Sequence, residues 1–566
     1  MSSATPWLSH YDPGVPPSLA PYPDRTLVDE LADAARDRPK RPALLFKGST
    51  ITYAELDRLS DACAAAFISL GVKRGDRIAL MLPNCPQFSI AQFAAWKIGA
   101  IVAPLNPIYT EPELELPLRE HGVETILTLT RYYARIKRLQ PRTPLRRVIA
   151  TNIKEYLPAS LRVLFTMFRE KHDGDRVALV PGDHDFAHLL LVNRGRRPPR
   201  CEVTAIDPAV LLMSGGTTGT PKGVLGTHGA YIAAGRQVAA WITSISNPDG
   251  DVILAPLPLF HVYANVGTQG HAMVTHSTMA LVPNPRDIGD VLATIRRVKP
   301  AFATFVPTLY IALLNHPDVQ RGKVDFKSIK MCLSGSSALL ADTKQRFEAL
   351  TGGRIVEGYS LTEGMMACCI NPVIGPNKLG SVGLPVPDVH VRIFDGDHGT
   401  RVLAAGEVGE IAISAPQLMV GYWNRPEETS GVLRDHIDEG GTRRWLHTGD
   451  LGYLDDEGYL FIVDRKKDLI KTSGFQVWPR EIEEVLATHS AVDEVGVAGI
   501  ADPAKGEAVK AWVVLRAGHT VTEHDLRMFC RDKLAPYKVP SSIEFRKELP
   551  KTMVGKVLRR ALKEQT

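Results

Sequence analysis

The chain has 566 residues, too many for one hydrophobic core, so at least two domains are expected. An apolar share of 44% and a charged share of 23% are ordinary for a globular protein, and a net charge of +5 does not favour nucleic-acid binding. The seven cysteines are scattered and form no C-x-x-C pair. They argue against a disulfide framework or a zinc site and indicate a reducing compartment.

The first 25 residues are rich in proline and lack the apolar stretch of a secretory signal, so they predict an extended arm. The longest apolar run, residues 301–314, is too short to cross a bilayer. The C-terminal letters LKEQT are not a peroxisomal address. We therefore expect a cytoplasmic protein.

Helices and strands alternate in the first part of the chain. A helix is predicted over residues 52–70, because Thr52 and Glu55 form a capping box and Gly71 suits the residue after its end. A strand at 77–82, a helix at 86–99 and a strand at 124–129 follow. This alternation predicts βαβ units and an α/β fold with parallel sheets.

Residues 131–147 carry seven basic side chains and no acidic one. The helix predicted after Pro158 places Leu161, Leu164, Phe165 and Phe168 on one face. A basic flank beside an amphipathic helix can lie on an anionic membrane, at its inner face in a cytoplasmic protein. Alternatively, the apolar face packs on the core of the protein itself.

The strand predicted at 210–213 leads into SGGTTGTPKG, residues 214–223. Glycines let a backbone approach phosphate oxygens, hydroxyls donate to them, and Lys222 adds a positive charge. The run does not match G-x-x-x-x-G-K-[ST], and Pro221 disfavours a helical Thr220. The pattern predicts a mobile loop that holds a polyphosphate, with Lys222 outside any helix.

Other segments suit the same ligand. Glu363 in EGYSLTEG is a hard oxygen ligand that suits Mg²⁺. Asp450 in WLHTGD can accept hydrogen bonds from a ribose, and Arg465 can pair with the sugar or a phosphate. Near the end of the chain, Lys556 follows a glycine in KTMVGKVLRR. The composition of this segment alone suggests that Lys556 is a solvated surface charge.

The pattern changes near Asp464, after which about a hundred residues read as a small α+β unit, with VDRKKD as a hinge. We expect an extended arm at 1–25, a large domain at 26–464 and a small mobile domain at 465–566. The predicted fold class is α/β, with a large N-terminal domain of layered α/β subdomains and parallel sheets, and a small α+β C-terminal domain.

Taken together, the segments resemble the adenylate-forming superfamily, from about Thr26 to Arg560. The motifs that carry the resemblance occur in the family's order and read SGGTTGTPKGV, PLPLFH, EGYSLTEG, GSVGLP, WLHTGDLG, VDRKKDLIKTSGFQVWPREIE and LPKTMVGKVLRR. The resemblance implies that Mg-ATP activates a carboxylate to an acyl-adenylate and pyrophosphate. In the CoA ligases of the family, a thiol then displaces AMP.

Site roles follow from the resemblance alone. It implies that the β- and γ-phosphates bind Ser214, Gly215, Gly216, Thr217, Thr218, Gly219, Thr220, Pro221 and Lys222. It places Mg²⁺ at Glu363 and close to Thr218. It places adenine among Ser334, Gly335, Ser336, Glu357, Gly358, Tyr359, Ser360 and Thr362, and the ribose at Asp450 and Arg465. It implies that His261 borders the acyl site and that Lys471 and Gln476 lie near the adenylate and act in the thioester step. It further implies that Lys556 acts in adenylation and that Lys467 is the hinge residue.

Two positions depart from a common family pattern, namely Gly215 and Val554, where many members have serine. Both variants resemble long-chain acyl-CoA synthetases, and residues 153–171 resemble an insertion of bacterial long-chain fatty acid ligases. We therefore expect a fatty acyl-CoA ligase with ATP, Mg²⁺ and CoA, and a homodimer is an open expectation. The alternatives are a 4-coumarate-type aromatic acid ligase, a fatty-acyl-AMP ligase that loads a carrier protein, and a non-catalytic homologue.

Overall fold

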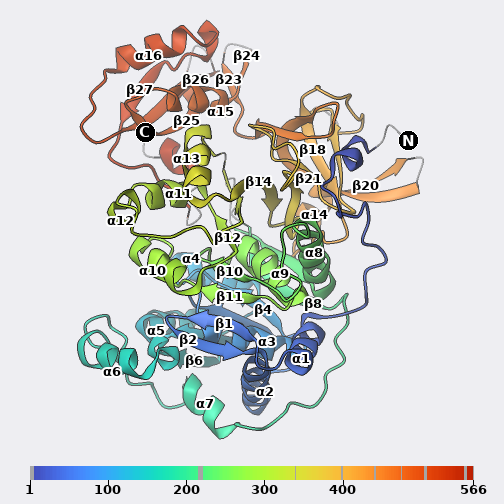
Figure 1. Cartoon of the computed structure of the whole chain (residues 1–566), viewed down its shortest axis with the longest axis vertical. Helices are drawn as coiled ribbons and strands as arrows, with labels where there is room; N and C mark the ends of the chain where they lie inside the picture. Colours follow the sequence, from blue (N-terminus) through green and yellow to red (C-terminus); the bar gives the residue numbers. More distant parts are fainter. Residues whose placement is uncertain are drawn as a thin grey trace.

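The computed structural model describes residues 5–214, 221–337, 339–396, 399–438, 441–472, 475–502, 506–552 and 557–564, with the backbone alone at Asp438 and Gln476. These residues form four sheets with helices around them (Figure 1). The two larger sheets form an α/β body, and the predicted fold class is confirmed.

Sheet I is parallel from β8 to β7 and antiparallel at its other edge. Its strands in spatial order are β19 (Gly421–Tyr422), β9 (Gly223–Thr227), β8 (Pro208–Met213), β4 (Ile101–Pro104), β3 (Arg77–Met81), β5 (Thr125–Leu129), β6 (Arg147–Thr151) and β7 (His184–Asp185). The strands predicted at 77–82, 124–129 and 210–213 are β3, β5 and β8.

Sheet II is parallel from β14 to β1, with antiparallel strands at both ends. Its strands are β16 (Leu384–Pro385), β15 (Met366–Ile370), β14 (Arg354–Leu361), β13 (Met331–Ser334), β12 (Phe302–Phe305), β10 (Val252–Ala255), β11 (Thr278–Leu281), β1 (Pro42–Phe46) and β2 (Ser49–Thr52). Central strands such as β12 and β13 are buried along their whole length, as expected where helices cover both faces.

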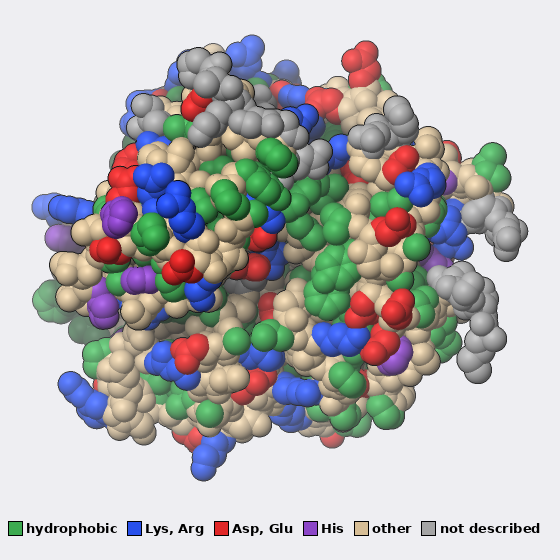
Figure 2. All heavy atoms as spheres, turned by 90° about the horizontal axis from the view of Figure 1, so that it is seen from above, with side chains coloured by type: hydrophobic (Ala, Val, Ile, Leu, Met, Phe, Trp, Pro, Cys, Tyr) green, Lys and Arg blue, Asp and Glu red, His purple; other side chains and the backbone are tan. Residues whose placement is uncertain are grey.

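Two smaller sheets complete the fold. Sheet III is antiparallel and consists of β17 (His390–Phe394), β18 (Gly409–Ser414), β21 (Gly441–Leu454) and β20 (Leu433–Asp438), with β22 (Leu460–Arg465) on β21. Sheet IV consists of β24 (Phe475–Val477), β23 (Ile470–Thr472), β26 (Gly506–Leu515) and β25 (Val492–Asp502), with β27 (Ser542–Phe545) on β26. Seen from above, the surface is hollowed between these two units (Figure 2).

Helices connect and cover the sheets. They are α1 (Leu27–Asp37), α2 (Tyr53–Ser69), α3 (Pro86–Lys97), α4 (Glu111–Glu120), α5 (Tyr133–Leu139), α6 (Ala159–Phe168), α7 (Phe186–Val192), α8 (His228–Trp241), α9 (Gln269–Val274), α10 (Ile288–Val298), α11 (Pro307–Leu314), α12 (Pro317–Gln320), α13 (Ala341–Thr351), α14 (Pro426–Val432), α15 (Pro479–Ala487), α16 (Glu523–Arg531) and α17 (Arg559–Glu564). The capping box predicted for Thr52 and Glu55 begins α2, and Gly71 follows its end with φ +81°.

The seven cysteines all lie among the described residues and are free thiols, as predicted. In the part of the chain that the structure covers, no helix is both long and apolar enough to cross a membrane.

Helix α6 forms where the sequence predicts it, but its apolar side chains do not pack on the core. Leu161, Val163, Leu164, Met167 and Phe168 are 41–69% exposed, and Figure 1 shows α6 at the periphery. The alternative that this face packs on the core is therefore wrong.

The basic side chains before α6 are less available for contact with an anionic membrane than the composition of the segment suggests. Arg131 pairs with Asp175, Lys137 with Asp183, and Arg138 with Glu111. These acidic partners lie outside residues 131–147, so the sequence pattern did not reveal them.

Candidate active site

The polyphosphate loop predicted at 214–223 joins two antiparallel strands, β8 and β9. Ser214 is buried at the end of β8, where its backbone N–H donates to the Lys222 carbonyl over 2.8 Å and its Oγ accepts from the Lys222 N–H over 3.1 Å. Lys222 therefore precedes a strand rather than a helix, as predicted. Residues Gly215, Gly216, Thr217, Thr218, Gly219 and Thr220 lie outside the described residues.

Lys222 is held by neighbours that the sequence analysis did not identify. Its ammonium forms an ion pair with Glu428 of α14 and lies 4.6 Å from the centre of the Tyr422 ring. Lys222 directly precedes β9, and Tyr422 belongs to β19. The two residues lie close together because β19 pairs with β9 at the edge of sheet I.

Glu363, predicted to bind Mg²⁺, lies in the turn after β14 of sheet II. The Tyr422 hydroxyl donates to its Oε1 over 2.9 Å, and its carbonyl accepts from the Met419 N–H over 3.0 Å. Burial and then the negative charge of Glu363 raise the pKa of Tyr422, so the phenol stays a donor at neutral pH. Tyr422 thus links the edge of sheet I to the end of β14.

The predicted adenine residues gather at the carboxyl ends of β13 and β14. Ser334 ends β13 directly opposite Glu357 of β14, and a Cβ on Gly335 would lie 3.3 Å from the Tyr263 ring. Ser336 has φ +76°, which marks a tight turn after β13. Burial raises the pKa of Glu357, whose Oε2 accepts from the Leu339 N–H over 3.4 Å. Gly358 and Ser360 continue along β14, and Thr362 is buried in the turn beyond it.

Asp450 lies in β21 of sheet III and connects it to sheet II through Tyr359 of β14. It is 6% exposed, and its two oxygens accept from the Tyr359 hydroxyl over 2.5 Å and the Arg465 Nε over 3.0 Å. Burial alone would lower the pKa of Arg465, but the charge of Asp450 raises it. The structure therefore brings together Asp450, Arg465 and the predicted adenine residue Tyr359.

Lys467 lies at the surface two residues after Arg465. Partial desolvation and the positive charge of Arg465 lower its pKa to about 8, although Asp468, Asp450 and Glu363 act in the other direction. The predicted hinge residue Lys467 is therefore close enough to Asp450 and Glu363 for their negative charges to affect its pKa.

Lys471 and Gln476 face each other across the β23–β24 hairpin of sheet IV. Lys471 is exposed, and its backbone N–H donates to Glu507 over 2.8 Å. The Gln476 side chain and the whole of Lys556 lie outside the described residues.

His261 belongs to the loop between β10 and the π-helical turn η5 (Tyr263–Thr268), a local irregularity that is frequent at functional sites. Asn84 holds this loop by accepting from the Leu259 N–H over 2.7 Å. Burial lowers the pKa of His261 to about 4, so its imidazole is neutral at physiological pH.

The donor set fits Mg²⁺ bound with substrate oxygens. Glu363 offers a half-buried carboxylate that Tyr422 holds in place. Over the described ranges, no group of three or more His, Cys, Asp and Glu side chains could hold a metal by itself. Mg²⁺ is usually held by one or two carboxylates together with substrate phosphates and water.

Known proteins are similar to the chain over almost its whole length. Residues 31–423 match the model of the AMP-binding enzyme family, and residues 481–556 match the AMP-binding enzyme C-terminal domain. A long-chain-fatty-acid--CoA ligase of Bacillus subtilis is 41% identical, over 100% of this chain and 99% of the relative. One of Salmonella typhimurium is 36% identical, over 99% and 98%. The 4-coumarate--CoA ligase 2 of Oryza sativa is 34% identical, over 94% and 90%.

Solved structures show the same fold. ATP-bound MatB of Rhodopseudomonas palustris has a TM-score of 0.80 at 26% identity, covering 96% of this chain and 99% of that one. The anthranilate CoA ligase AuaEII in complex with anthranoyl-AMP has a TM-score of 0.81 at 26% identity, covering 96% and 97%. By its sequence over almost its whole length and by its fold, the chain belongs to the AMP-binding enzyme family.

Proposed function

We propose that this protein is an AMP-forming acid–thiol ligase that activates a long-chain fatty acid with Mg-ATP and then transfers the acyl group to CoA. The observation that carries the proposal is the convergence of Lys222, Glu363, Asp450 and Arg465 where sheets I, II and III meet. The relatives named long-chain-fatty-acid--CoA ligase support the choice of acid, because they match the chain from end to end.

In the first step, the fatty carboxylate attacks the α-phosphorus of ATP, the bond to the bridging oxygen breaks, and pyrophosphate leaves with that bond's electrons. An anion approaches a polyanion, so orientation and positive charge lower the barrier. Ser214 to Lys222 bind the β- and γ-phosphates, Glu363 with Thr218 holds Mg²⁺, and Lys556 stabilises the adenylate. Bound Mg²⁺ supplies positive charge at the phosphate oxygens.

The nucleoside is held by two groups of residues. Ser334 to Ser336, Glu357 to Ser360 and Thr362 surround adenine, while Asp450 and Arg465 bind the ribose. The Tyr359 and Arg465 donors hold both Asp450 oxygens in a fixed orientation, which suits recognition of two neighbouring hydroxyls.

In the second step, the CoA thiol attacks the acyl carbon of the mixed anhydride, its proton is lost, and AMP leaves. Pyrophosphate has gone, so the site needs different surroundings. We assign that change to a small domain at 465–566 that turns about Lys467 against the large domain at 26–464 and presents Lys471 and Gln476.

The acyl site is bordered by the neutral His261, which suits an apolar chain better than a charged imidazole does. A 4-coumarate-type aromatic acid remains the alternative substrate, because a ligase of that name is also similar over most of the chain. A fatty-acyl-AMP ligase that transfers to a carrier protein is the alternative acceptor reaction.

We also propose that α6 contacts the inner face of an anionic membrane from the cytoplasm. Five of its six large apolar side chains are 41–69% exposed, and Arg162 and Arg169 flank them on an exposed surface. Such a surface would bring the enzyme to the bilayer in which fatty acids dissolve. The homodimer stays a prediction that sedimentation velocity would test.

The deciding experiment is pyrophosphate exchange into ATP with palmitate, followed by product analysis with CoA. We expect palmitate-dependent exchange, AMP as the nucleotide product and palmitoyl-CoA only when CoA is added. Formation of ADP and orthophosphate would contradict the proposal. A 4-coumarate activity exceeding that with palmitate would favour the alternative substrate, and a panel of acids of increasing length would define the preferred chain.

A further inference from the structure

Lys222 of the polyphosphate loop already has an anionic partner in the protein. Its ammonium is paired with the Glu428 carboxylate of α14, and the two side chains are 29% and 38% exposed. A lysine in this loop is expected to meet phosphate oxygens, yet here it is directed to a carboxylate.

Glu428 does not depend on Lys222 for a counter-charge. Arg425 Nη1 donates to Glu428 Oε1 over 2.7 Å, and the same guanidinium donates to Glu120 Oε1 over 2.5 Å. If Lys222 moved away, Glu428 would keep a hydrogen-bonded cation beside it. Releasing Lys222 therefore leaves no unpaired charge behind.

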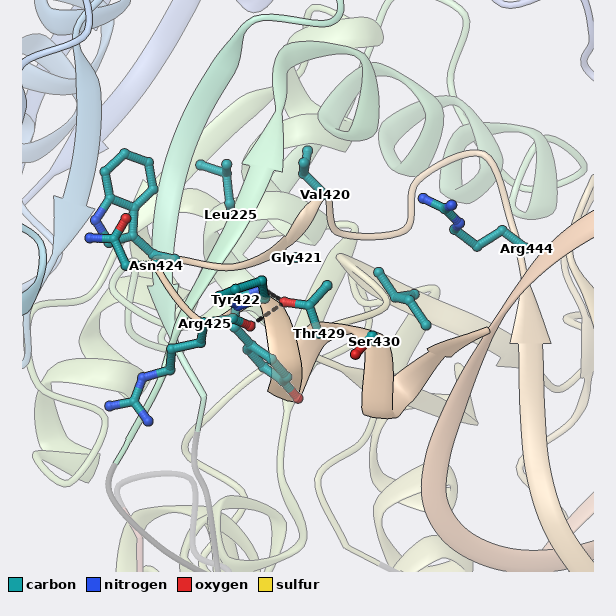
Figure 3. Close-up of a pocket in the computed structure, with 12 residues that line it drawn as sticks. Leu225, Val420, Gly421, Tyr422, Asn424, Arg425, Thr429, Ser430 and Arg444 are labelled. Atoms are coloured by element: carbon teal, nitrogen blue, oxygen red, sulfur yellow. Dashed lines mark hydrogen bonds between the residues drawn. The ribbon is translucent and has the colours of Figure 1, made fainter. Parts of the chain in front are cut away.

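The position of α14 relative to β19 is fixed by local hydrogen bonds. The Tyr422 N–H donates to Thr429 Oγ1 over 2.9 Å, and that hydroxyl donates to the Arg425 carbonyl over 2.8 Å (Figure 3). The Tyr422 ring lies under the Lys222 ammonium, while its hydroxyl binds Glu363. Glu428 is thus held next to the groups to which the proposed function assigns the polyphosphate and Mg²⁺.

We propose that Glu428 holds Lys222 when no nucleotide is bound and competes with the ATP polyphosphate for its ammonium. The inference rests on the proposed function, which places the polyphosphate at this loop. Two anions repel each other at one ammonium group, so Lys222 exchanges the carboxylate for the phosphates when ATP enters. Glu428 then remains paired with Arg425.

The expected effect on ATP binding is modest. The Lys222–Glu428 pair is partly exposed, and such pairs are weak because solvent screens them. Removing the competing charge should therefore tighten ATP binding by about two- to five-fold. Glu428→Gln makes this change while keeping the shape of the side chain and its acceptor oxygen for Arg425.

The test measures binding of Mg²⁺ with α,β-methylene-ATP by calorimetry, without acid or CoA. We expect tighter binding by Glu428→Gln, a smaller gain for the shortened but charged Glu428→Asp, and no change for Glu427→Gln. Glu427 is the matched control, because it lies next to Glu428 on α14 and is exposed. In a Lys222→Ala background, Glu428→Gln should not tighten nucleotide binding.

Unchanged or weaker nucleotide binding by Glu428→Gln would overturn the competition. So would an equal gain in the Lys222→Ala background, because the effect would then not pass through Lys222. Conversion of preformed palmitoyl-adenylate to palmitoyl-CoA should be the same in the Glu428→Gln and wild-type proteins, since that step has no polyphosphate. Absence of palmitate-dependent exchange in the wild type would count against the proposed function alone, because the binding assay contains no acid.

Discussion

Arg559 offers a sharp test of how the C-terminal segment is attached to the rest of the protein. Its guanidinium donates to Asp464 over 2.9 Å, to Asp468 over 3.0 Å, and to both oxygens of Glu483 over 3.1 and 2.7 Å. Asp464 belongs to β22 of sheet III, whereas Glu483 belongs to α15 beside sheet IV. One side chain therefore ties α17 to both sides of the predicted hinge.

We expect Arg559→Met to weaken this junction strongly. Removing one partner from a buried ion pair costs about 3–5 kcal/mol, because it leaves an uncompensated charge. The Arg559 side chain is 18% exposed, so we take the lower end, about 3 kcal/mol. At about 1.4 kcal/mol for each factor of ten, local opening should become about 100-fold more frequent.

Hydrogen exchange read by mass spectrometry would measure this opening in peptides of α15, α17 and β25. Arg560→Met is the matched control, because Arg560 is 62% exposed and pairs only within its own helix with Glu564 among the described residues. Arg559→Lys should fall between wild type and Arg559→Met, since it keeps the charge but loses the forked geometry. Equal exchange in the Arg559→Met and Arg560→Met proteins would refute the reasoning.

Three further predictions concern catalysis, pH and the surface. Lys556→Ala should slow adenylation by about 10²–10³-fold and largely spare thioester formation from supplied acyl-adenylate, as separate half-reaction assays would report; equal losses would contradict the division of steps. Burial lowers the pKa of His121, His228, His261 and His271 from 6.5 to about 4. The unfolded chain binds more protons there, so the free energy of unfolding should be highest above pH 6.5 and fall as pH drops towards 4; a flat profile in urea titrations would contradict this. A Leu164→Glu, Met167→Glu, Phe168→Glu variant should sediment less with anionic vesicles than wild type, whereas Ile437→Glu, which alters an exposed residue of β20, should not; equal loss in both would argue against α6 as the contact.

The sequence predicted the elements whose signals are local. The Thr52–Glu55 capping box and the strand before Ser214 both depend on neighbouring residues, and both occur. The order of short motifs also identified the family, because each motif can be read without knowing where the others lie in space. The roles assigned from those motifs, including those of Lys556 and residues 215–220 outside the described structure, remain proposals.

The sequence did not predict partners that are distant along the chain. Residues 131–147 read as an unneutralised basic segment, but acidic residues such as Glu111, Asp175 and Asp183 fold onto it. The pairing of Lys222 with Glu428 was missed for the same reason, since more than 200 positions separate them.

By itself, the amino-acid order determined the α/β class, the succession of helices and strands, and the loop chemistry that favours a nucleotide. Only the folded chain decided which charges neutralise one another, that α6 exposes its apolar side chains, and that Tyr422 joins Lys222 to Glu363. The physical reason is that hydrogen bonding within a turn or helix depends on residues a few positions apart. Ion pairing and burial depend instead on which surfaces the sheets bring together.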